Sequence, residues 1–119
     1  MAVPDLFLYT DASNVGWGAS LLQDSVSGYW DIEERSLHIN ILELRVICLG
    51  LRHLAEVLRN SVVAVFSDNT TALACLSREG GTHSTLLTKE AWEILDWAEM
   101  HSVQILTLFV RGSDSVVAD

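Results

Sequence analysis

The stretch Leu8–Leu22, LYTDASNVGWGASLL, decides the fold because it joins two apolar runs through a short polar turn. Residues 6–11 (LFLYTD) are rich in apolar and aromatic residues and predict a first strand. Residues 16–23 (GWGASLLQ) predict a second strand. After a turn over 24–27 we expect a short third strand at 28–32, which completes an antiparallel meander.

The rest of the chain alternates helices with strands. Helical spacing of apolar residues predicts a helix over about 40–59, with Asn40 as its N-cap. Residues 62–67 (VVAVFS) are typical of a buried central strand. Two helices, at 70–79 and 84–101, and a last strand at 103–110 follow. The order βββ-α-β-α-α-β predicts a single α/β domain over residues 1–119, with a five-stranded mixed sheet and helices on both of its faces.

Charge and composition restrict the function. Half of the residues are hydrophobic, as in a globular domain. The net charge is −9, with 7 Lys and Arg against 16 Asp and Glu, which argues against a stand-alone nucleic-acid binder unless another domain or subunit supplies a basic surface. Cys48 and Cys75 are expected to be two buried thiols of a reducing compartment.

Neither a membrane span nor a secretion signal is predicted. Charged residues interrupt the longest apolar run, at 41–58, and residues 1–10 lack a basic region and a cleavage signal. We therefore expect an intracellular protein of the cytoplasm or nucleus that has no membrane partner.

Four carboxylates stand out, each in a separate setting along the chain. Asp11 ends the first strand, Glu43 lies on the apolar face of the first long helix, Asp68 ends the central strand, and Asp119 is the last residue. Acidic groups placed where a fold prefers apolar side chains are costly unless a cation neutralises them. The pattern predicts a divalent metal site, and phosphodiester hydrolysis is the chemistry most often built on such a site.

Three of the four acids also have a simpler interpretation. Glu43 could lie at the rim of a helix–sheet contact and reach water or an Arg. Asp68 could be a helix N-cap, and Asp11 could form a turn. The metal hypothesis therefore depends on the acids coming together.

The chain resembles the ribonuclease H domain of a retroelement reverse transcriptase. The resemblance rests on Leu8–Leu22, HINILEL at 38–44, VFSDNTTALACL at 65–76, Gly80-Gly81 and the closing Gly112 with Ala118-Asp119. The strings HINILEL, SDNTTA and GGTHS are most similar to the DIRS-like group, whose elements use a tyrosine recombinase.

The resemblance implies that Asp11, Glu43, Asp68 and Asp119 bind two Mg²⁺ or Mn²⁺ ions and cleave the RNA strand of an RNA–DNA hybrid. Mg²⁺ prefers oxygen ligands, and two ions about 4 Å apart can clamp a scissile phosphate. By the same resemblance Asp11 would bridge both ions, Glu43 and Asp68 would complete the shell of the first, and Asp119 would serve the second. Asp119 is expected to be the least secure ligand, since the C-terminal carboxylate lies beside it.

Four polar residues are candidates for contacts with the 2′-hydroxyl groups that distinguish RNA from DNA: Ser13, Asn14, Asn69 and Thr70. Turn and capping chemistry is an equal alternative for all four. Expected partners are an RNA–DNA hybrid and a reverse transcriptase domain or another basic partner.

The chain departs from the family pattern near its end. Phe109 stands where relatives carry a His that assists turnover, and Ser115 replaces an Asn of the same loop. We therefore expect weak activity. It should be higher in Mn²⁺, because the coordination demands of this ion are looser. One alternative is a weak or inactive derivative that serves as a protein-interaction or nucleic-acid docking module. Another is a resolvase or transposase core, against which the strings TDAS and GWGA argue.

Overall fold

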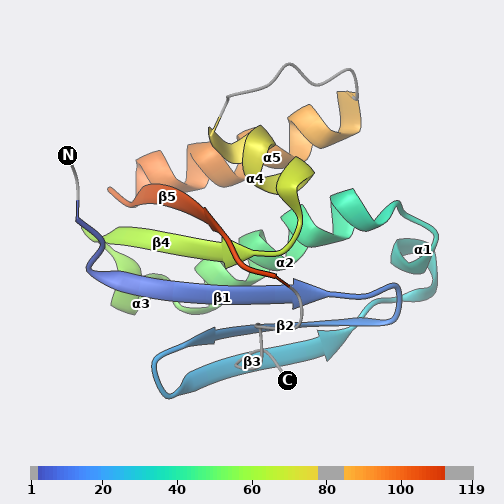
Figure 1. Cartoon of the computed structure of the whole chain (residues 1–119), viewed down its shortest axis with the longest axis horizontal. Coiled ribbons are helices and arrows are strands. Elements are labelled where there is room, and N and C mark those ends of the chain that lie inside the picture. Colours follow the sequence, from blue (N-terminus) through green and yellow to red (C-terminus); the bar gives the residue numbers. More distant parts are fainter. Residues whose placement is uncertain (1–2, 78–84, 112–119) are drawn as a thin grey trace.

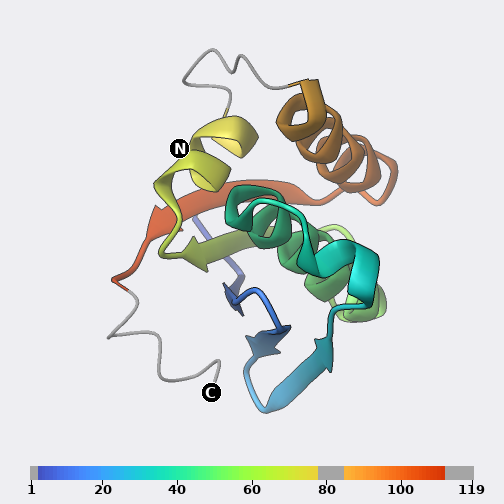
Figure 2. The same ribbon diagram turned by 90° about the vertical axis from the view of Figure 1, so that its right-hand side faces the viewer.

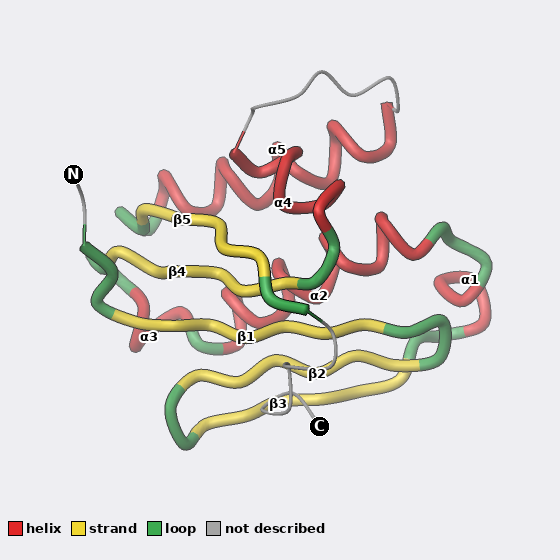
Figure 3. The backbone as a smooth tube through the Cα atoms, viewed as in Figure 1, coloured by secondary structure: helices red, strands yellow, loops and turns green. Residues whose placement is uncertain are grey.

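A computed structural model describes residues 3–77 and 85–111 of the chain. Its strands are β1 Leu6–Ala12, β2 Gly16–Leu21, β3 Asp24–Tyr29, β4 Val62–Ser67 and β5 Gln104–Phe109. They form one sheet in the order β3-β2-β1-β4-β5 (Figures 1 and 3). The β1–β2 and β2–β3 pairs are antiparallel, whereas β1–β4 and β4–β5 are parallel. The predicted five-stranded mixed sheet is thus confirmed.

The described helices are α1 Ile32–Arg35, α2 Ile39–His53, α3 Ala55–Leu58, α4 Thr70–Ser77 and α5 Thr85–Met100. Within the described ranges they lie on one face of the sheet, whereas helices on both faces were expected (Figure 2). The core forms between this face and the helices. Leu8 and Val65 of the strands and Ile47 and Ile94 of the helices are buried in it.

The third strand begins earlier than its sequence suggests. β3 starts at Asp24, so the expected turn over 24–27 is wrong, and Leu22-Gln23 make the turn instead. Leu22 has φ 55°, a left-handed conformation that favours Gly or Asn. Without either residue type the sequence does not mark this turn, and the polar residues of β3 become a strand by pairing with β2.

The helix expected over 40–59 is divided, and its N-cap is also different. α2 ends near Leu54, whose ψ of 19° departs from helical geometry, and α3 follows. The N-cap is His38, whose Nδ1 accepts a hydrogen bond of 3.0 Å from the backbone N–H of Asn40. Asn40 therefore lies inside the first turn, with its side chain available for another contact.

Parallel pairing brings two predicted acids to one edge of the sheet. Tyr9 of β1 pairs with Phe66 of β4, and two residues further along each chain come Asp11 and Asp68. Because parallel strands end at the same edge, both acids come to that edge.

Among the described residues no helix is long and apolar enough to cross a membrane.

Candidate metal centre

Three of the four predicted carboxylates come together at this edge. Asp11, Glu43 and Asp68 each offer one oxygen, and these oxygens all lie within 4.8 Å of one another. Asp11 and Asp68 are half-buried, whereas Glu43 is only 3% exposed. Asp119 lies outside the described residues, so its role as a fourth ligand stays a prediction.

The close packing of α2 on the sheet places Glu43 in this cluster. A Cβ on Gly50 would lie 2.9 Å from the Cβ of Ala19 in β2, so only glycine permits this approach. The face of α2 that carries Gly50 and Ile47 also carries Glu43, which is thus directed to the strand ends rather than to solvent.

Glu43 is held in its protonated form by its surroundings. Burial, followed by a hydrogen bond with Asp68 and the charges of Asp68 and Asp11, raises the pKa of Glu43 to about 9. A hydrogen bond from the backbone of Ala12 acts in the opposite direction. Glu43 Oε1 is buried and has no hydrogen-bond partner within the described part of the chain.

This donor set fits a hard divalent cation. Three carboxylates from separate elements present only oxygen ligands, which Mg²⁺ and Mn²⁺ prefer. An orphaned buried carboxyl oxygen is costly, and a bound cation would satisfy it. The simpler interpretation of Glu43, as a rim residue that reaches water, is not what the structure shows, since Glu43 is 3% exposed. The neighbouring Arg45 pairs with Glu34 and Glu90.

Hydrogen bonds behind the carboxylates join the elements that carry them. The Asn69 side chain accepts from the N–H of Ala72 at 2.8 Å and donates to Asn40 Oδ1 at 2.8 Å. Asn69, rather than Asp68, therefore caps α4. The buried Thr10 hydroxyl donates to the carbonyl of Phe66 at 3.2 Å and ties β1 to β4. The sequence did not predict these ties, since no local pattern signals partners so far apart along the chain.

Comparisons with known proteins place this arrangement in a fold. No family model and no curated protein matches the chain. The solved structure of LC11-RNase H1 in complex with an RNA/DNA hybrid matches with a TM-score of 0.82 at 14% identity, over 97% of this chain and 91% of that one. RNase H1 from the halophilic archaeon Halobacterium salinarum NRC-1 matches with a TM-score of 0.77 at 12% identity, over 95% and 92%. The chain has a ribonuclease H-like fold.

A viral enzyme shares the ribonuclease H-like fold in part of its length. The foamy viral protease-reverse transcriptase, solved in complex with dsDNA, matches with a TM-score of 0.65 at 11% identity, over 92% of this chain and 24% of that one. Identities this low show the fold alone.

The four candidate substrate residues lie at the same edge of this ribonuclease H-like fold, or beside it. Ser13, Asn14 and Thr70 are exposed. The Ser13 hydroxyl accepts hydrogen bonds from the N–H groups of Val15 and Gly16, as a turn residue does. Asn69 is half-buried, and both the nitrogen and the oxygen of its side-chain amide already make hydrogen bonds. Contacts of these residues with a substrate stay predictions.

Phe109 places an apolar side chain at the same edge of the sheet. It is the last residue of β5, pairs with Ser67 of β4, and is 55% exposed. It thus belongs to a strand, next to the end from which Asp68 emerges. Ser115 lies outside the described residues.

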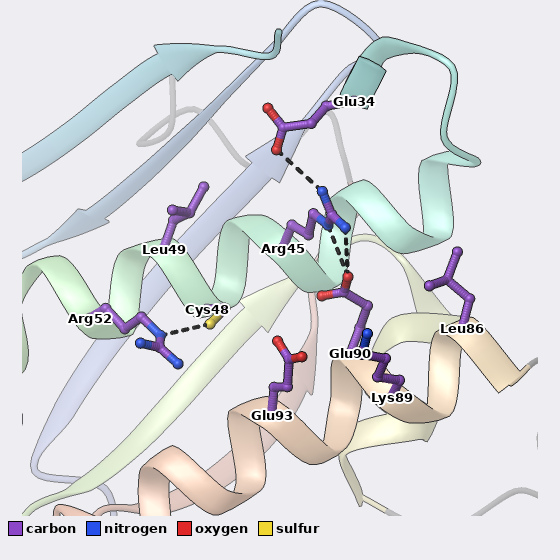
Figure 4. A pocket seen from close by; sticks show the side chains of 9 residues that line it. All are labelled: Glu34, Arg45, Cys48, Leu49, Arg52, Leu86, Lys89, Glu90 and Glu93. Carbon is purple, nitrogen blue, oxygen red and sulfur yellow. Dashed lines mark hydrogen bonds and ion pairs between the residues drawn. The ribbon is translucent and has the colours of Figure 1, made fainter.

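Away from the carboxylates, a groove lies between α2 and α5 (Figure 4). This groove has a volume of about 300 Å³, and in it Arg45 contacts Glu34 at 3.3 Å and Glu90 at 2.9 Å. Arg52 donates to the sulfur of Cys48. Cys48 and Cys75 are half-buried rather than buried. Arg45 is therefore paired on both sides and joins α2 to α1 and α5.

Proposed function

We propose that the chain is a metal-dependent endoribonuclease that cleaves the RNA strand of RNA–DNA hybrids. The observation that carries the proposal is the meeting of Asp11, Glu43 and Asp68 within 4.8 Å at the strand ends of a ribonuclease H-like fold. A structural neighbour with a TM-score of 0.82 was solved with an RNA/DNA hybrid, which supports this substrate class.

Asp11, Glu43 and Asp68 would hold Mg²⁺ or Mn²⁺, with Asp119 as a fourth ligand. When bound, these ions would stabilise negative charge on a scissile phosphate and favour ionisation of an attacking water. Asp11, at the end of β1, is the candidate to contact two ions. Glu43 binds a cation only after losing its proton, so metal affinity should rise with pH.

We assign the domain to a retroelement reverse transcriptase of the DIRS-like group, acting inside the cell in the cytoplasm or nucleus. The sequence strings HINILEL and SDNTTA support this origin. The net charge of −9 supports a second, basic partner that holds the hybrid, such as a reverse transcriptase domain.

Cleavage of a hybrid with labelled RNA tests the proposal. Wild type should cut the RNA in Mg²⁺, and faster in Mn²⁺. Asp11→Asn and Glu43→Gln should each lower the rate by about a hundredfold or more, because a metal ligand contributes several kcal/mol of charge stabilisation. Asp24→Asn is the matched control, since Asp24 is an exposed acid at the opposite end of the sheet. RNA cleavage that persists in both variants, or in EDTA, contradicts the proposal.

A non-catalytic docking module is the second candidate. The exposed Phe109 beside the strand end, where the resemblance predicts a His, favours it. Under this alternative, wild type leaves the hybrid intact, and the melting temperature of the protein is the same in EDTA, Mg²⁺ and Mn²⁺.

A further inference from the structure

We propose that Asn40 and Asn69 form a positioning pair that sets the separation between Glu43 and Asp68. The inference rests on the proposed function, because it concerns the ligands of the same metal centre. It assigns these two side chains to the shaping of the site, in place of the cap and substrate roles predicted for them.

The hydrogen-bond geometry fixes the orientation of the Asn69 amide. Its Oδ1 accepts the N–H of Ala72 at 2.8 Å, which only an oxygen can do. Its Nδ2 must then face Asn40, and Asn40 must present Oδ1, at 2.8 Å. The backbone N–H of Asn69 also donates to Ser67 Oγ at 3.1 Å, so Asn69 is held from three directions.

Each member of the pair lies next to a ligand. Asn40 and Glu43 are three residues apart on α2, so their side chains lie on neighbouring positions of one helix face. Asn69 directly follows Asp68. The Asn40–Asn69 bond therefore joins the first turn of α2 to the start of α4, at the level of the two carboxylates.

The Asn40–Asn69 pair can fix the separation of the two metal ligands when both ligands are charged. In the metal-free protein a hydrogen bond joins Glu43 to Asp68. Once a cation replaces the proton, the carboxylates carry like charges and repel, so contacts between them no longer fix their separation. An amide–amide hydrogen bond carries no net charge and persists with or without a cation. Groups that orient metal ligands in this way typically change metal affinity by about 10–100-fold when removed.

Mn²⁺ titration by calorimetry separates positioning from simple structural support. Asn40→Ala removes the bridge and leaves the Asn69 cap of α4 intact. Asn69→Ser keeps a capping hydroxyl and is too short to reach Asn40. Each single variant should bind Mn²⁺ about 10–100-fold more weakly. The double variant should be no weaker than the worse single one, since one bond is lost in all three.

The matched control is Thr71→Ala, an exposed residue in the first turn of α4. It should bind Mn²⁺ as wild type does. Thermal melts in EDTA establish that each variant is folded at the titration temperature. If the variants melt lower and yet bind Mn²⁺ with wild-type affinity, the pair only supports the fold and the inference is overturned, while the proposed function stands. If wild type itself binds no Mn²⁺, the metal centre is refuted, and the positioning role with it.

Discussion

Glu43 makes the stability of the metal-free protein depend on pH. Its pKa is about 9 in the folded chain against 4.5 as the ordinary value, so between these values the folded state binds the extra proton. Stability contributed by that proton is present below about pH 4.5 and is lost as pH rises toward 9. In EDTA, unfolding free energy should fall from pH 5 to pH 8 by on the order of 2–4 kcal/mol more in wild type than in Glu43→Gln.

Urea denaturation at several pH values measures this difference. Glu56→Gln is the control, since Glu56 is an exposed acid on α3, and its curve should run parallel to that of wild type. Saturating Mg²⁺ should reverse the trend in wild type, because metal binding favours the deprotonated folded state. Equal pH dependence in wild type and Glu43→Gln would show that Glu43 is not held protonated.

The sequence predicted the carboxylates of the centre better than their supports. Asp11 and Asp68 were predicted because strand ends meet at one edge of the sheet. Glu43 was predicted because an acid on an apolar helix face is costly unless a cation neutralises it. The partnership of Asn40 with Asn69 depends on how closely α2 approaches α4, and tertiary packing decides that distance.

At the scale of elements, Gly50 sets how closely α2 packs on the sheet. In Gly50→Ala the new methyl group meets Ala19 at 2.9 Å, so α2 must move away from β2. Overpacking of this kind costs about 1–3 kcal/mol. Glu43 would move with the helix, so Mn²⁺ affinity should fall together with the unfolding free energy. Leu49→Ala, at the neighbouring exposed position, should leave Mn²⁺ affinity unchanged.

Arg45 joins three helices, and its loss should expose the cost of burying Glu90. Glu90 on α5 is 8% exposed, and its carboxylate contacts Arg45 at 2.9 Å. Arg45→Met leaves this carboxylate without its cation and should lower the unfolding free energy by roughly 1–3 kcal/mol, since the Arg side is partly solvated.

The double variant Arg45→Met, Glu90→Leu should recover most of that loss in urea denaturation, because no unpaired charge remains. Additive losses in the double variant would mean that the two residues stabilise the fold independently of their contact.

Local signals located most elements and failed where pairing overrides them. Residues 62–67 were predicted as the central strand and form β4 with the same bounds. β3 was misplaced because Leu22 adopts a turn conformation unusual for its type. α1 was missed although Asp31 and Glu34 form a capping box, a signature that the spacing D-x-x-E could have revealed.

The charge of the whole molecule limits how it can hold a hybrid. Its 7 Lys and Arg stand against 16 Asp and Glu, and the Arg45 side chain in the α2–α5 groove is already paired with Glu34 and Glu90. Few Lys and Arg side chains therefore remain to neutralise phosphates and release their counterions. We therefore expect the isolated chain to bind hybrids more weakly than about 10 μM at physiological salt, with a log–log salt slope of magnitude below about 2.

Fluorescence anisotropy with a labelled hybrid measures both quantities, and Asp11→Asn in Mg²⁺ prevents cleavage during the titration. A version of this variant with six lysines added at its N-terminus mimics a basic partner. Each lysine that reaches a phosphate should steepen the slope by about 0.9 and tighten binding at low salt. Submicromolar binding with a steep slope in the untagged variant would mean that the fold gathers its few cations into one surface, and a separate basic partner would then be unnecessary.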